Sequence, residues 1–121
     1  MDINSLASFT LEGCRFSKSS YTFEFSGQLD GKFRTFLVST SYNLSLPNSD
    51  KIDVEKNFSS VVWNMIEQNL ESAVVNNDRE IPTILFNFEN GSSFEIWSDE
   101  PLIDNMLIVT DVESGDWFPV C

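Results

Sequence analysis

Alternation of apolar and polar residues, ended each time by a hairpin turn, is the feature that most limits how this chain can fold. In residues 21–25 the three aromatic side chains share one side of an extended chain and the polar ones share the other. Asp30-Gly31 follows, a pair typical of two-residue hairpin turns. A second alternating run at residues 84–88 precedes Asn90-Gly91 and a return strand at 94–97. These patterns predict antiparallel hairpins.

The two strand clusters resemble each other. Leu11-Glu12-Gly13 precedes Phe23-Glu24-Phe25 in the first, and Leu70-Glu71-Ser72 precedes Phe86-Asn87-Phe88 in the second. One interpretation is a weak internal repeat of strand, strand, hairpin and strand. The other is that any two antiparallel meanders look this similar, and the sequence leaves both open.

One segment, residues 57–71, has the helical period instead. Its apolar residues recur at spacings of three and four, which is typical of one face of an amphipathic helix: Phe58, Val61, Val62, Met65, Ile66 and Leu70. Asn57 is a plausible N-cap, and Asp53 is an alternative start one turn earlier.

Together these elements predict an α+β fold. We expect a single domain over residues 1–121, with a mostly antiparallel sheet of six to eight strands, two meander repeats as one possibility, and one main helix at about 57–71. The predicted core comprises Phe23, Phe25, Phe36, Val38, Val62, Met65, Ile66, Ile84, Phe86, Ile96 and Ile108.

Charge and composition exclude several functions. Nineteen Asp and Glu stand against seven Lys and Arg, giving a net charge of −12, so the chain would repel nucleic acids and anionic membranes. There is no histidine, the commonest general base and metal ligand. Cys14 and Cys121 are expected to be free thiols. No signal peptide or membrane-length apolar run is recognisable, which favours the cytoplasm.

Catalytic and metal-binding motifs are also missing. The sequence has no glycine-rich phosphate loop, no Gly-x-Ser-x-Gly and no Cys-x-x-Cys. The acids of residues 111–116 lack the length and the closing Glu of an EF-hand calcium loop. We therefore predict no enzymatic activity, no catalytic residue, no cofactor and no metal.

The acidic residues are concentrated in the last third of the chain. Residues 80–121 hold nine Asp and Glu and no Lys or Arg. Solubility is one explanation, and a face that meets a basic partner is the other. Two loops, each beside a tryptophan, form the predicted partner-binding surface, although either tryptophan could instead pack in the core: Asp99, Glu100, Asp104, Asp111, Glu113, Asp116, Trp97 and Trp117.

Several of these segments resemble bacterial immunity proteins, the partners of contact-dependent growth inhibition toxins and other polymorphic toxins. The resembling segments are Leu11-Glu12-Gly13, residues 86–91, residues 94–97 and residues 115–118. The resemblance implies a protein that binds and neutralises a cognate toxin. It also implies a basic, nuclease-type toxin, because many toxins of this kind are basic nucleases, and such a partner would suit the net charge of −12. It transfers no individual binding residue.

Two alternatives remain from the sequence. A small acidic secretion chaperone would also be short, acidic and α+β, but such chaperones usually dimerise, whereas we expect this chain to be a monomer when free. A small-ligand-binding module is the other alternative.

Overall fold

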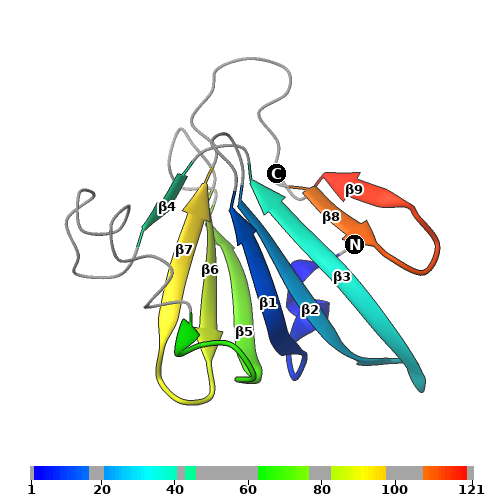
Figure 1. The fold of residues 1–121 in the computed structure, drawn as a ribbon, viewed down its shortest axis with the longest axis horizontal. Helices are drawn as coiled ribbons and strands as arrows, with labels where there is room; N and C mark the ends of the chain where they lie inside the picture. Colours follow the sequence, from blue (N-terminus) through cyan, green and yellow to red (C-terminus); the bar gives the residue numbers. More distant parts are fainter. Residues whose placement is uncertain are drawn as a thin grey trace.

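The fold is built almost entirely of antiparallel strands (Figure 1). A computed structural model describes residues 2–16, 21–40, 43–45, 63–76, 83–97 and 108–119. One sheet has five strands in the order β1-β2-β3-β8-β9, and the other has four in the order β4-β7-β6-β5. We call them sheet A and sheet B. No helix in the described part of the chain is long and apolar enough to span a membrane.

The elements follow the hairpins of the sequence. A 3₁₀ helix, η1 (Ile3–Leu6), precedes the strands. Sheet A contains β1 (Thr10–Phe16), β2 (Tyr21–Leu29), β3 (Lys32–Thr40), β8 (Ile108–Asp111) and β9 (Trp117–Pro119). Sheet B contains β4 (Asn43–Ser45), β5 (Leu70–Asn76), β6 (Thr83–Phe88) and β7 (Ser93–Trp97). The predicted turn between β2 and β3 is present, with Asp30 and Gly31 both at positive φ.

The predicted α+β class with a main helix at 57–71 is wrong. Residues 57–62 lie outside the described residues, but a turn over 64–67 follows Trp63, and the chain enters β5 at Leu70. Glu67 has a φ of 71°, a left-handed conformation that ends a helix. Nine strands are described, more than the six to eight expected. The apolar spacing also suits a strand from Leu70 onward, because Leu70 and Ala73 lie on either side of a bulge and both face the core.

The two meanders of the predicted repeat match in detail. Leu11 pairs with Phe25 and Leu70 pairs with Phe88, and a bulge follows each leucine. The meanders meet at an antiparallel bridge between Thr10 and Asn69. The equivalent backbone bonds occur twice, since Leu11 N donates to Gln68 O while Leu70 N donates to Phe9 O. An approximate twofold axis therefore passes between Thr10 and Asn69.

The symmetry extends to the ends of each meander. After β3 the chain crosses to sheet B, where β4 pairs with β7, and after β7 it crosses to sheet A, where β8 pairs with β3. Before each first strand, Ser8 and Glu67 occupy equivalent left-handed positions. The segment predicted as the end of a helix is thus the counterpart of the segment around η1.

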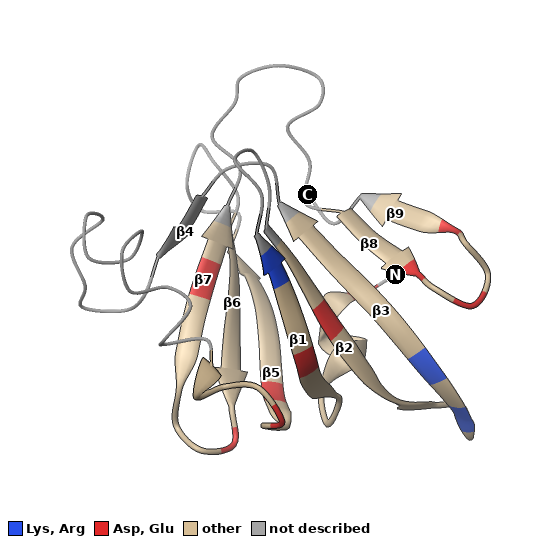
Figure 2. Cartoon of the chain, viewed as in Figure 1, with Lys and Arg blue, Asp and Glu red and all other residues tan. Residues whose placement is uncertain are grey.

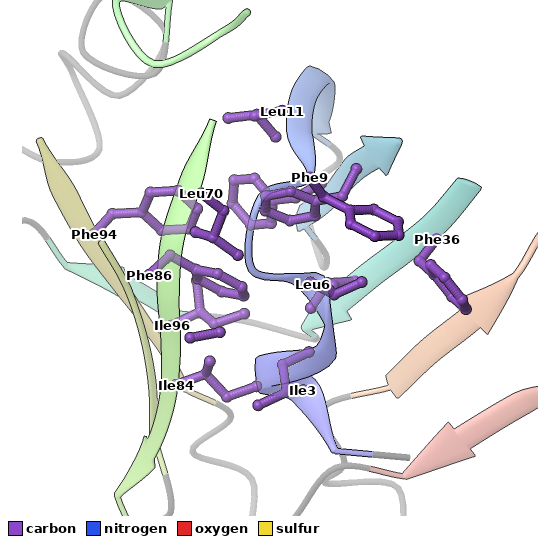
Figure 3. Close-up of a cluster of buried hydrophobic side chains, with 14 of the residues drawn as sticks. Ile3, Leu6, Phe9, Leu11, Phe36, Leu70, Ile84, Phe86, Phe94 and Ile96 are labelled. Atoms are coloured by element: carbon purple, nitrogen blue, oxygen red, sulfur yellow. The ribbon is translucent and has the colours of Figure 1, made fainter. Parts of the chain in front are cut away.

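The core lies between the two sheets, and phenylalanine rings dominate it (Figure 3). Phe23 of sheet A stacks on Phe94 of sheet B at 4.7 Å between ring centroids, and Phe25 stacks on Phe86 at 5.4 Å. Ile3 and Leu6 of η1 enter the same cluster. Eight of the predicted core residues are buried: Phe23, Phe25, Phe36, Val38, Met65, Ile84, Phe86 and Ile96.

The other three core predictions differ in outcome. Ile66 is only half-buried but packs against the core, Ile108 is half-buried and its prediction is wrong, and Val62 lies outside the described residues. Ile108 pairs with Ser39, on the side of sheet A that faces away from the core. Val109, its neighbour, occupies the buried position instead.

Replacing Glu67 by Gly should raise the stability of the protein. Glycine adopts positive φ without the Cβ clash of an L-residue, so we expect the free energy of unfolding to rise by about 0.5–1 kcal/mol. Chemical denaturation measures this free energy of unfolding. Glu71→Gly is the control, because it makes the same change at an exposed β5 position without positive φ, and it should lower stability. Equal losses in both variants would contradict the strain assigned to Glu67.

Candidate functional site

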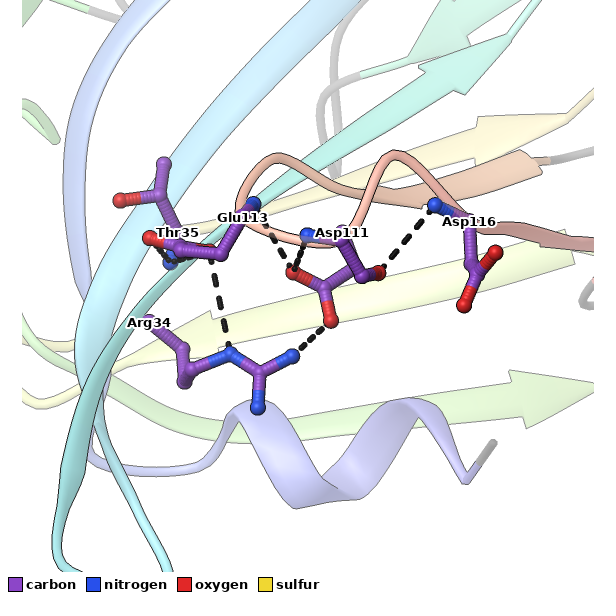
Figure 4. Close-up of polar contacts among 6 residues, drawn as sticks. Arg34, Thr35, Asp111, Glu113 and Asp116 are labelled. Atoms are coloured by element: carbon purple, nitrogen blue, oxygen red, sulfur yellow. Dashed lines mark hydrogen bonds and ion pairs between the residues drawn. The ribbon is translucent and has the colours of Figure 1, made fainter.

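The second predicted acidic loop forms the turn between β8 and β9, at the edge of sheet A (Figure 4). Thr110 of β8 pairs with Trp117 of β9, and the six residues between them form the turn. Backbone bonds close it, from Asp111 N to Asp116 O and from Gly115 N to Asp111 O, each at 2.8 Å. Gly115 has a φ of 77°, which a non-glycine residue rarely adopts.

Asp111 is not a surface residue. It lies opposite Phe36 on the core side of the sheet, is buried, and forms an ion pair with Arg34 Nη2. Its Oδ1 accepts hydrogen bonds from the backbone N–H groups of Glu113, at 3.1 Å, and Ser114, at 3.4 Å. Asp111 therefore holds the turn in shape and is not available to a partner, which corrects its predicted role.

Glu113 is exposed but is also used within the protein. Both of its carboxylate oxygens accept from Thr35 N at 3.1 Å, and Oε2 lies 3.8 Å from Arg34 Nε. The carboxylate thus satisfies a β3 amide at the point where β8 ends. No local pattern in the sequence points to Arg34, because it lies far from residues 111–116 along the chain. It is packed over the Phe36 ring, with 5.8 Å from guanidinium carbon to ring centroid.

Trp117 and Asp116 are exposed at the end of this turn. Trp117 is 58% exposed, so the core interpretation is wrong for this tryptophan. Neighbouring Val112 is 50% exposed, and its backbone N–H bonds to Thr35 O. The Asp116 carboxylate points away from the network of Arg34 and Asp111 (Figure 4). An exposed aromatic ring and an exposed carboxylate therefore lie next to each other at the end of a braced turn.

The rest of the predicted surface is not brought to this turn. Trp97 belongs to β7 in sheet B, and its side chain is outside what the structure describes. Asp99, Glu100 and Asp104 lie outside the described residues. Trp97 and Trp117 therefore lie in different sheets, and a single surface with two tryptophans stays a prediction.

A second feature of sheet A is a shallow hollow on the face that points away from the core. We call it the β1–β2 hollow, and it is lined by Gly13, Cys14, Arg15, Thr22, Glu24 and Leu37. Burial raises the pKa of the Cys14 thiol above its ordinary value. A thiol that stays protonated at neutral pH is a poor nucleophile, so this cysteine does not suit covalent catalysis.

The described residues carry many more acidic than basic side chains (Figure 2). Lys and Arg occur there at three positions, Arg15, Lys32 and Arg34. Asp and Glu occur at eleven: Asp2, Glu12, Glu24, Asp30, Glu67, Glu71, Glu89, Glu95, Asp111, Glu113 and Asp116. Within the described ranges, no three His, Cys, Asp or Glu side chains come together as a metal-binding group.

Comparison of the chain with protein-family models, with curated proteins and with solved structures gave no match.

Arg34→Met should destabilise the protein by leaving Asp111 buried without its cation. We expect a loss of about 2–3 kcal/mol, below the range for a fully buried pair because the Arg34 side chain is 28% exposed. Asp111→Asn keeps an oxygen for the two turn amides, and the double variant should lose less than the sum of the single changes. Strict additivity in urea denaturation would contradict the coupling.

Cys14 should react slowly with thiol reagents. Its raised pKa leaves less thiolate at neutral pH than a free cysteine has, so the rate with a disulfide reagent at pH 7.5 should fall below that of free cysteine. The rate should keep rising with pH above the range where ordinary thiols reach their plateau. A Cys121→Ser background isolates the signal, and a rate above that of free cysteine would contradict the assignment.

Proposed function

We propose that this chain is an immunity-type protein that binds and neutralises a basic protein toxin in the bacterial cytoplasm. It acts by binding alone, as a monomer when free, without catalysis, cofactor, nucleic acid or membrane. The observation that carries the proposal is Trp117, more than half exposed beside Asp116 on a turn that internal bonds already hold in shape.

The chemistry of protein interfaces supports this use of Trp117. Tryptophan is enriched among the few residues that contribute most of the binding energy, where it fills a pocket on the partner. A side chain on a braced turn also loses less conformational freedom on binding than one on a loose loop. Arg34, Asp111 and Glu113 supply that bracing, so they support the interface without being part of it.

The charge of the chain supports a basic partner. Among the described residues eleven acids stand against three bases, and nine of the eleven acids are exposed. Such a surface steers a positively charged protein toward it and raises the association rate. It repels RNA and DNA, which makes a protein partner the better match for an acidic surface with an exposed aromatic ring.

Trp117→Ala should weaken the complex with the cognate toxin at least about 30-fold, which corresponds to roughly 2 kcal/mol for a hot-spot residue. The candidate toxin is the product of the adjacent gene, assayed for growth inhibition with and without this chain and for binding by titration calorimetry. Trp63→Ala is the matched control, since Trp63 is 73% exposed but precedes β5 in the other meander.

Asp116→Ser should weaken binding less than Trp117→Ala does, and mainly by slowing association. The difference in association rate between Asp116→Ser and the unmodified chain should shrink as the salt concentration rises. Circular dichroism confirms that each variant is folded. If Trp117→Ala and Trp63→Ala bind like the unmodified chain, the β8–β9 turn is not the interface. If the chain neither binds the adjacent product nor protects cells from it, the immunity function is wrong.

A further inference from the structure

The approximate twofold symmetry allows one half of the molecule to serve as a reference for the other. Gly13 pairs with Glu24 in the first meander, and Ser72 pairs with Asn87 at the equivalent place in the second. In the second meander Asn87 Nδ2 donates to Ser72 Oγ at 3.1 Å, so two side chains fill the position and satisfy each other. In the first meander neither the second side chain nor the hydrogen bond exists.

Gly13 leaves real space on the sheet. A Cβ placed on Gly13 would meet no atom within 4 Å, and its φ is not positive, so nothing in the local backbone requires glycine there. The β1–β2 hollow occupies this space. A structural role does not explain why the first meander has glycine beside a carboxylate where the second has a bonded pair.

The hollow offers a carboxylate to a ligand. Glu24 is exposed, and the ion pairs found among the described residues both involve Arg34. Leu37 gives the hollow an apolar side chain, the missing side chain of Gly13 leaves room above it, and Thr22 adds a hydroxyl whose oxygen lies 3.2 Å from Ser39 Oγ. Arg15 and Thr22 form the next pair on the same face, beside the pair of Gly13 and Glu24. The Arg15 guanidinium can donate to a hydrogen-bond acceptor that enters the hollow with the cation that meets Glu24.

We propose that the β1–β2 hollow receives a lysine or arginine side chain of the basic protein that this chain binds. The apolar stem lies over Gly13 and Leu37, the cation pairs with Glu24, and the backbone carbonyl of the inserted residue accepts from Arg15. This assignment rests on the proposed function, because it names the chemistry of the same partner.

The register of sheet A places the hollow and Trp117 on one line. Glu24 pairs with Leu37, Leu37 with Thr110, and Thr110 with Trp117, so these residues form a single row across the sheet. Paired residues of antiparallel strands point to the same face. Four strand spacings separate Gly13 from Trp117, or about 19 Å, which lies within one interface of ordinary size.

Filling the hollow tests the proposal. Gly13→Leu should fold normally and weaken toxin binding at least tenfold, and Glu24→Gln should do the same by removing only the charge. The matched controls come from the other meander, where Ser72→Leu and Glu71→Gln should change the Kd less than twofold. Thermal unfolding of each variant shows that the fold is intact, and Glu24→Gln decides the question if Gly13→Leu does not fold.

A probe that needs no toxin separates this proposal from the proposed function. Titration of the ¹⁵N-labelled chain with Nα-acetyl-lysine methylamide at millimolar concentrations should shift the amides of Gly13, Thr22 and Glu24, and Glu24→Gln should abolish the shifts. If Gly13→Leu and Glu24→Gln bind the toxin normally while Trp117→Ala does not, the hollow proposal is overturned and the immunity function stands. If the toxin never binds, the titration alone decides, and the absence of shifts overturns the proposal.

Discussion

The reciprocal backbone pairing around Thr10 and Asn69 is the interaction on which the rest of this structure depends. It joins two three-stranded meanders that share a pattern of bulge, inward leucine and phenylalanine strand. Because the joint lies at one end of β1 and β5, the meanders can turn toward each other, and Phe23 meets Phe94 while Phe25 meets Phe86. The same joint leaves the face of sheet A that carries Gly13 and Trp117 turned away from the core.

Positions at which the two meanders differ are candidates for a binding role. Positions that form the joint and the core are matched: Leu11 with Leu70, and Phe25 with Phe88. On the outward face Gly13 and Glu24 replace Ser72 and Asn87, and the first meander has a hollow with a carboxylate there. A duplicated fold keeps both halves similar where stability requires it, so an unmatched outward position is a reasonable place to look for binding.

Local patterns in the sequence predicted the hairpins and most of the inward aromatics, because alternation and turn residues act over a few positions. The helix prediction failed because the choice between helix and strand at Leu70 is made at long range, by Phe9 O accepting its N–H. Burial of Asp111 depends on Arg34, which no local pattern connects to it. Ile3 and Leu6 were missed for the same reason. Gly27 does reflect the packing of this N-terminal segment, since a Cβ there would lie 2.9 Å from the ring of Phe9.

At this surface, electrostatic attraction and apolar packing would act on a partner at different distances. In physiological salt the Debye length is about 8 Å, so the exposed carboxylates act on a partner mainly as it approaches. They add little once water is excluded unless each finds a cation, as Glu24 would in the hollow. Trp117 acts only after contact, when its ring leaves water. Asp111 accepts from backbone amides of its own turn and Glu113 accepts from Thr35, so the backbone that leads to Trp117 is braced before a partner arrives. In the proposed complex, net charge would therefore govern how fast the partners associate, and Trp117 would govern how long the complex lasts.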